Sequence, residues 1–136
     1  MEITRAFVRR FRLLELLRAS LGLASAFNLG LALLLFAAPE TPARWLHLAA
    51  PQQPVYTWLL ASLLAMLSVL YLFAAQDPRR YSGIILVAIG GRALEALVLG
   101  IGAASRPELS GLWVLAGVDL AFSAGHAATW LPLRVP

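Results

Sequence analysis

Four long apolar stretches, separated by short segments that contain proline and charged residues, divide this chain of 136 residues. They cover about 14–38, 55–75, 82–104 and 109–133, and all ten glycines lie inside them. Each stretch is long enough to cross a hydrocarbon core of ~30 Å as a helix, which takes ~20 residues. Proline ends helices because it lacks an amide hydrogen, whereas glycine allows spanning helices to pack closely. The pattern predicts an all-α, integral membrane four-helix bundle that forms a single transmembrane domain over residues 1–136.

Two shorter segments outside these spans also have helical features. Hydrophobic residues recur every three or four positions from Ile3 to Leu14, opposite several arginines. Such a pattern is typical of an amphipathic helix that lies along the membrane interface. In the first connection, Thr41 and Pro42 resemble a helix start and Pro51 a stop. We therefore expect short amphipathic helices at the N-terminus and in the first connection.

The composition agrees with a membrane protein. Hydrophobic residues make up 60% of the chain and charged residues 13%, whereas soluble domains have about 45–50% and about 25%. The net charge is +4, and every basic residue is an arginine. Because these arginines flank apolar runs, we expect them to face a lipid bilayer and expect no nucleic-acid partner. The absence of cysteine excludes disulfides and thiol chemistry.

The distribution of arginine predicts the orientation. Five arginines precede or begin the first span, two lie in the second connection and one lies in the tail, whereas each other connection has one. By the positive-inside rule, both termini should be cytoplasmic and the chain a multi-pass protein of the inner (plasma) membrane. Aromatic residues near the span ends would then form interfacial belts. The predicted inner belt comprises Tyr71, Tyr81 and Trp130, and the outer belt Trp45, Tyr56, Trp58 and Trp113.

Three charged residues fall at the predicted midplane. Arg92 and Asp119 are each the eleventh residue of an antiparallel span, and Glu95 follows Arg92 by three positions on the same helix face. A charge at this depth costs about 2.5–3.5 kcal/mol, and intramembrane charges are usually paired or functional. We infer an Arg92–Asp119 ion pair between helices, with Glu95 as a second partner or a protonated neighbour. The cluster is either structural or a transport or binding site.

Other polar residues share the faces of these spans. Asn28 in the first span is of the type that hydrogen-bonds between membrane helices. Ser123 and His126 share a face with Asp119 in the fourth span, and His126 is either a core histidine or a ligand. Asp119 and His126 lie ~10 Å apart along their helix, too far to share a metal ion. No catalytic triad, metal site or cofactor site is expected, and no glycine-rich phosphate loop occurs.

Several short motifs make the chain resemble the small four-helix bacterial membrane proteins of the DoxX-like kind. The residues that carry this resemblance are Asn28-Leu29-Gly30, Tyr71-Leu72, Asp77-Pro78, Gly91-Arg92 and Asp119. Some members of that group are small subunits of membrane redox complexes. The resemblance therefore implies a four-helix membrane fold and an accessory role in a larger complex.

Three functions follow as hypotheses. The leading one is a non-catalytic membrane protein, either an accessory subunit or a homo-oligomer, that binds an apolar ligand or lipid between its helices. The second is a proton-coupled transporter of small solutes that uses Arg92, Glu95 and Asp119. The third is a membrane enzyme on a lipid-soluble substrate, with His126 and Asp119 as acid and base. The three hypotheses can be discriminated by whether a cavity in the structure contacts Arg92, Asp119 and His126.

Overall fold

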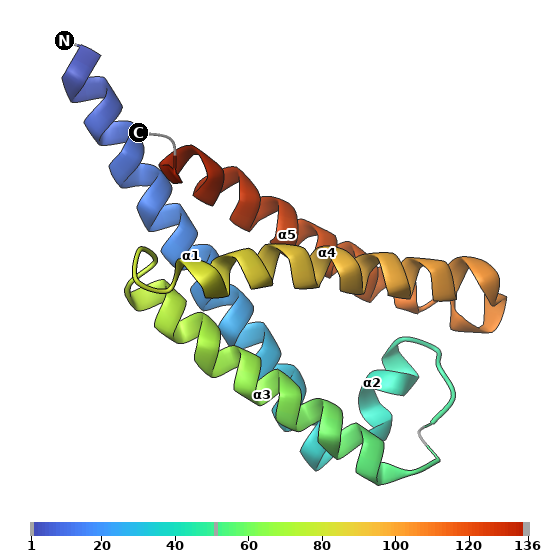
Figure 1. The fold of residues 1–136 in the computed structure, drawn as a ribbon. Helices are drawn as coiled ribbons and strands as arrows, with labels where there is room; N and C mark the ends of the chain where they lie inside the picture. Colours follow the sequence, from blue (N-terminus) through green and yellow to red (C-terminus); the bar gives the residue numbers. More distant parts are fainter. Residues whose placement is uncertain (1, 51, 135–136) are drawn as a thin grey trace.

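In the computed structural model, which describes residues 2–50 and 52–134, all regular secondary structure is helical. The elements, shown in Figure 1, are α1 (Glu2–Ala37), α2 (Glu40–Trp45), α3 (Pro54–Gln76), α4 (Ser82–Ser105), the 3₁₀ helix η1 (Pro107–Leu109) and α5 (Leu112–Arg134). By length and composition, α1, α3, α4 and α5 can each cross a membrane. The prediction of an all-helical membrane protein with four spans is therefore confirmed.

The helix boundaries differ from the predicted ones mainly at α1. The N-terminal amphipathic segment is not a separate helix, because α1 runs without a break from Glu2 to Ala37. The physical reason is that neither glycine nor proline occurs before Gly22, so nothing in the sequence ends the helix. At the other end of the chain, Pro132 lies inside the last turn of α5 and does not end it.

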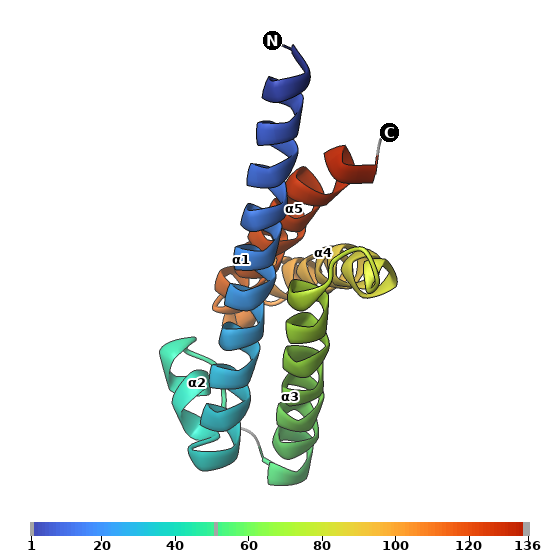
Figure 2. The same cartoon turned by 90° about the vertical axis from the view of Figure 1, so that its left-hand side faces the viewer.

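The four long helices form two antiparallel pairs, α1 with α3 and α4 with α5. The pairs meet chiefly where α1 packs on α5, while α3 and α4 touch over a smaller area. Figures 1 and 2 show that α3 and α4 diverge from the connection that joins them. The start of α1 and the end of α5 lie at the same end of the bundle (Figure 1). This divergence places the functional site described below between the two pairs.

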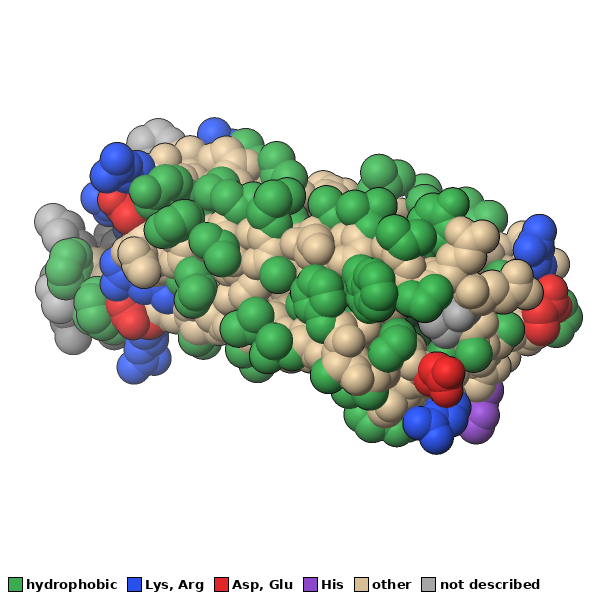
Figure 3. All heavy atoms as spheres, turned by 90° about the horizontal axis from the view of Figure 1, so that it is seen from below, with side chains coloured by type: hydrophobic (Ala, Val, Ile, Leu, Met, Phe, Trp, Pro, Cys, Tyr) green, Lys and Arg blue, Asp and Glu red, His purple; other side chains and the backbone are tan. Residues whose placement is uncertain are grey.

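The hydrophobic core is concentrated where the four helices converge. Its main cluster comprises Leu17, Leu21, Ala74, Ile85 and Trp130, one or more from each long helix. Towards the opposite end, Ala32 and Leu35 of α1 pack with Ala61 of α3, and partly buried Leu64 and Ala65 of α3 pack against this smaller cluster. On the face seen in Figure 3, hydrophobic side chains cover much of the middle, and charged side chains gather at the two ends. An apolar belt between two charged ends is the surface that a lipid bilayer requires.

The connections at the far end of the bundle touch each other. A Cβ atom added at Gly111 would lie 1.7 Å from the carbonyl oxygen of Leu46. The backbone after α2 is therefore in direct contact with the backbone that precedes α5. This contact links the two helix pairs at the end where they have otherwise diverged.

Candidate functional site

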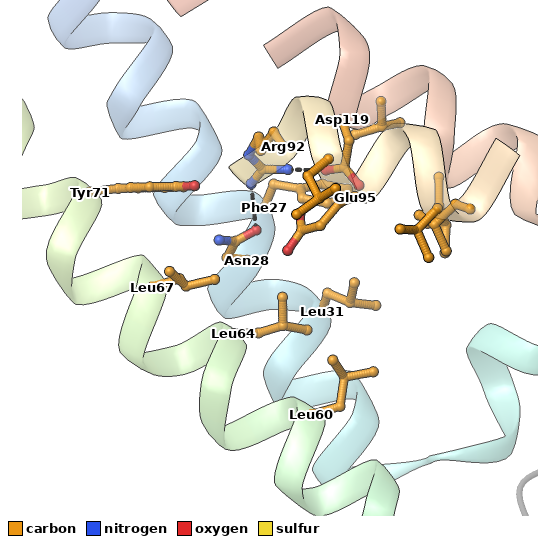
Figure 4. A pocket seen from close by; sticks show the side chains of 15 residues that line it. Phe27, Asn28, Leu31, Leu60, Leu64, Leu67, Tyr71, Arg92, Glu95 and Asp119 are labelled. Atoms are coloured by element: carbon orange, nitrogen blue, oxygen red, sulfur yellow. Dashed lines mark hydrogen bonds and ion pairs between the residues drawn. The ribbon is translucent and has the colours of Figure 1, made fainter. Parts of the chain in front are cut away.

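The predicted midplane charges lie at the centre of the bundle. Arg92 of α4 is 4% exposed, and its Nη1 donates a hydrogen bond to Oδ1 of Asp119 on α5 in a buried ion pair. Its Nη2 donates to Oδ1 of Asn28 on α1 at 2.7 Å. Figure 4 shows the guanidinium between these two acceptors. One arginine therefore ties α4 to both α5 and α1.

Two aromatic rings complete the surroundings of the guanidinium. The Cζ atom of Arg92 lies 4.7 Å from the ring centroid of Phe122 and 5.5 Å from that of Tyr71. Such rings attract a cation through their negative faces, most strongly where water is excluded. Because Tyr71 comes from α3, all four long helices contribute to the arginine site. In a bilayer, this shell provides much of the stabilisation that water would otherwise give to the charge.

The structure confirms the predicted Arg92–Asp119 pair, but the second partner of Arg92 differs from the expected one. Asn28, instead of Glu95, occupies the other side of the guanidinium. Among the described residues, Glu95 has neither a hydrogen bond nor an ion pair, and its side chain is exposed along a pocket. The expectation that Glu95 is a second partner of Arg92 is therefore wrong. Glu95 is instead a carboxylate neighbouring the pair.

Ser123 and His126 are buried on α5 and do not line the pocket described below. The Ser123 hydroxyl donates to the Ile89 carbonyl at 2.8 Å and so joins α5 to α4. His126 is fully buried, with ring centroids 6.0 Å from Phe122 and 6.2 Å from Tyr71. Its ring lies beside the Ser20 backbone, but neither ring nitrogen reaches hydrogen-bond geometry with a described residue. His126 is therefore enclosed in the bundle core with both ring nitrogens lacking a hydrogen-bond partner among the described residues.

Two residues expected in the inner aromatic belt instead face the bundle interior. Tyr71 and Trp130 are 4% and 5% exposed, with Tyr71 against Arg92 and Trp130 in the main core cluster. Their rings therefore pack inside the bundle and are not presented to lipid or water, as the rings of an aromatic belt would be. For Trp130, the helical spacing already indicates this outcome, since Trp130 falls on the helix face that also carries Asp119 and His126.

A pocket of about 390 Å³ adjoins the arginine site between the two helix pairs. Its polar end is formed by Asn28, Arg92, Glu95 and Asp119 (Figure 4), and its remaining lining is almost entirely leucine, valine and aromatic. The apolar lining residues are Phe27, Leu31, Leu60, Leu64, Leu67, Tyr71, Leu94, Val98, Leu99, Leu115 and Val118. The pocket is thus apolar along its length and polar at one end.

The pocket opens sideways between α3 and α4. Exposed Leu60 of α3 lines one side of it, and exposed Leu94 and Val98 of α4 line the other. This is where the two helices diverge. In a membrane, a molecule would therefore enter from the lipid and not only from water. His126 and Ser123 do not line this pocket.

The described residues also bear on metal binding. Within residues 2–50 and 52–134, no group of three or more histidine and acidic side chains is arranged to hold a metal ion. Asn28 Nδ2 and Arg92 Nε are buried donors without a hydrogen-bond partner in this part of the chain. Both atoms are enclosed by protein, so the exposed polar group that the pocket presents is the Glu95 carboxylate.

These features define a multi-pass membrane protein whose four spanning helices surround a buried ion pair beside a lateral pocket. Comparisons with known protein families, with curated proteins and with solved structures found no match for this chain.

Proposed function

We propose that this protein is a non-catalytic membrane protein that binds an amphipathic lipid or another largely apolar molecule between its helices. The observation that carries the proposal is the lateral pocket with its single polar end. Ligand pockets are mostly apolar clefts of ~300–1,000 Å³ with a few polar groups that fix orientation. An apolar chain would lie along the leucines of α3, and a polar group would meet Asn28 and Glu95.

The environment of the protein is part of the same proposal. We place it in the plasma membrane with both termini cytoplasmic, because its arginines concentrate at the end where α1 begins and α5 ends. The resemblance to DoxX-like proteins supports an accessory role in a larger membrane complex, and a homo-oligomer is the alternative. The exposed apolar faces of α3 and α4 offer room for such a neighbour as well as for lipid.

The experiment uses a photoreactive long-chain alcohol as a neutral amphipathic probe. The purified protein in detergent is irradiated with the probe, and the labelled peptides are identified by mass spectrometry. Leu64→Trp fills the pocket from α3, whereas Leu63→Trp changes an exposed neighbour that does not line it. We expect labelling of α3 and α4 that falls in Leu64→Trp and persists in Leu63→Trp. Equal labelling of both variants would contradict the proposal.

The proton-coupled transporter remains a second candidate because of one observation. Glu95 is a carboxylate at membrane depth without a hydrogen bond or ion pair to a described residue, so it is available to exchange a proton. Against this candidate, the arginine beside it is a permanent cation already held by Asp119 and Asn28. The enzyme hypothesis is disfavoured, since fully buried His126 does not line the pocket where a substrate would bind.

A further inference from the structure

The polar end of the lateral pocket has unequal numbers of positive and negative groups. Among the described residues that line the pocket, the charged ones are one cation, Arg92, and two carboxylates, Asp119 and Glu95. Arg92 donates one hydrogen bond to Asp119 and another to Asn28, which is neutral. With both carboxylates ionised, the cluster therefore has one negative charge in excess, and Glu95 carries it.

Glu95 lies where an unpaired charge is unfavourable. It is near the middle of α4, a spanning helix of 24 residues. Its side chain is exposed along the pocket and forms neither a hydrogen bond nor an ion pair with a described residue. Figure 4 shows the hydrogen bonds of Arg92 to Asp119 and Asn28, with none drawn to Glu95. An ionisable side chain at membrane depth usually has a partner of opposite charge, so a ligand could supply one here.

The described lining residues do not offer an anion a comparable partner. Arg92 and Asn28 are 4% and 1% exposed. Their unused donors, Nε of Arg92 and Nδ2 of Asn28, are enclosed by protein. An anionic head group in the pocket would therefore meet the Glu95 carboxylate without reaching these donors, and the two like charges would repel each other. A head group that carries a positive charge would pair with the same carboxylate.

The rest of the lining suits an apolar chain attached to such a head group. Leu60, Leu64 and Leu67 lie on one face of α3 and extend for ~10 Å along it. Phe27, which precedes Asn28 in α1, lines the pocket with a half-buried ring. Aromatic rings attract ammonium groups, including quaternary ones, through their negative faces. The opening between α3 and α4 admits a molecule that is dissolved in the lipid.

We propose that the ligand of the lateral pocket is an amphipathic cation, a molecule with an apolar chain and an ammonium group, whose charge pairs with the Glu95 carboxylate. This assignment rests on the proposed function, because it names the chemical class of the molecule that is bound between the helices. The chain lies along the leucines of α3, and the ammonium group contacts Glu95. Binding then balances the cluster, because two cations accompany two carboxylates.

The test is photolabelling of the purified full chain in an uncharged detergent, with three probes that share one photoreactive alkyl chain. Their head groups are trimethylammonium, hydroxyl and carboxylate. We expect the trimethylammonium probe to label α3 and α4 most strongly and the carboxylate probe most weakly. Glu95→Gln should lower labelling by the trimethylammonium probe about fivefold, the upper effect of an exposed ion pair, and leave labelling by the hydroxyl probe unchanged.

Two further variants complete the design. Glu15→Gln is the matched control, because Glu15 lies in an exposed pair with Arg18 and does not line the pocket. It should leave labelling by all three probes unchanged. Phe27→Leu removes the aromatic ring and keeps the Glu95 carboxylate. It should lower labelling by the trimethylammonium probe alone, which tests the site even if Glu95→Gln fails to fold.

The other outcomes separate the cationic ligand from the proposed function. Equal labelling by the three probes that falls in Leu64→Trp would keep the pocket as an apolar binding site and overturn the cationic ligand. A preference for the hydroxyl probe that disappears in Glu95→Gln would assign the site to a neutral hydrogen-bonding head group and overturn it as well. A preference for the trimethylammonium probe that persists in Glu95→Gln would also overturn it. If no probe gives labelling that falls in Leu64→Trp, the proposed function itself is overturned.

Discussion

Arg92 and Asp119 form a buried ion pair between α4 and α5, 27 residues apart in the chain and enclosed by all four spanning helices. The pair is held in place from the other side, because Asn28 of α1 accepts the second guanidinium hydrogen bond at 2.7 Å. In a medium that cannot solvate charge, each partner depends on the other. The Arg92–Asn28 hydrogen bond therefore couples the α4–α5 pair to the α1–α3 pair, at the level where the two pairs begin to diverge.

Arg92→Leu should strongly destabilise the protein, because it leaves Asp119 as an uncompensated buried charge. Breaking a buried pair in this way costs about 3–5 kcal/mol. The double variant Arg92→Leu/Asp119→Asn should recover part of that loss, as measured by thermal unfolding in detergent. Arg18→Leu, which breaks an exposed pair with Glu15, is the control and should cost less than about 1 kcal/mol. If the Arg92 and Asp119 effects simply add, the two residues are not energetic partners.

Gly111→Ala should destabilise the protein, because the new Cβ would lie 1.7 Å from the Leu46 carbonyl oxygen. The two connections would have to move apart, at a cost of about 1–3 kcal/mol. Gly117→Ala is the matched control in α5, since its Cβ would meet nothing within 4 Å. Melting temperatures of the two variants in one detergent check the prediction. A Gly111→Ala protein as stable as wild type would show that this contact does not matter.

The proposed orientation predicts which connections can be labelled from outside the cell. Because the chain has no cysteine, single cysteines can replace Gln52 and Gln76, both of which are exposed. On intact cells, a membrane-impermeant thiol reagent should label the cysteine at position 52 and not the one at position 76. The reverse result would invert the topology.

Reconstituted protein should not carry protons across liposomes under an imposed pH gradient. The reason is that Arg92 remains charged and already holds Asp119, which leaves Glu95 as the sole unpaired carboxylate of the cluster. Proton flux that disappears in Glu95→Gln, while the variant keeps the wild-type melting temperature, would favour the transporter. Glu15→Gln is the control, because Glu15 lies in an exposed pair away from the pocket.

The sequence by itself determined the number of spanning helices and the central ion pair. Both follow from the free energy of placing unpaired backbone groups or unpaired charges in a bilayer, which is unfavourable in any fold. An apolar run of this length needs a helix to satisfy its backbone, and two opposite charges at equal depth are cheaper together than apart. Arg92 and Asp119 could be matched because position along a straight helix translates directly into depth.

Only the tertiary structure decided which faces of the helices meet. The spanning helices are apolar nearly all round, so no polar face marks the side that points outward, as it does in a soluble bundle. Asn28 took the place expected for Glu95 because the rotation of α1 and α4 brings them together on that side. Tyr71 and Trp130 point inward for the same reason. The lateral pocket exists because α3 and α4 diverge, and a helix crossing angle depends on side chains distant in sequence packing against one another.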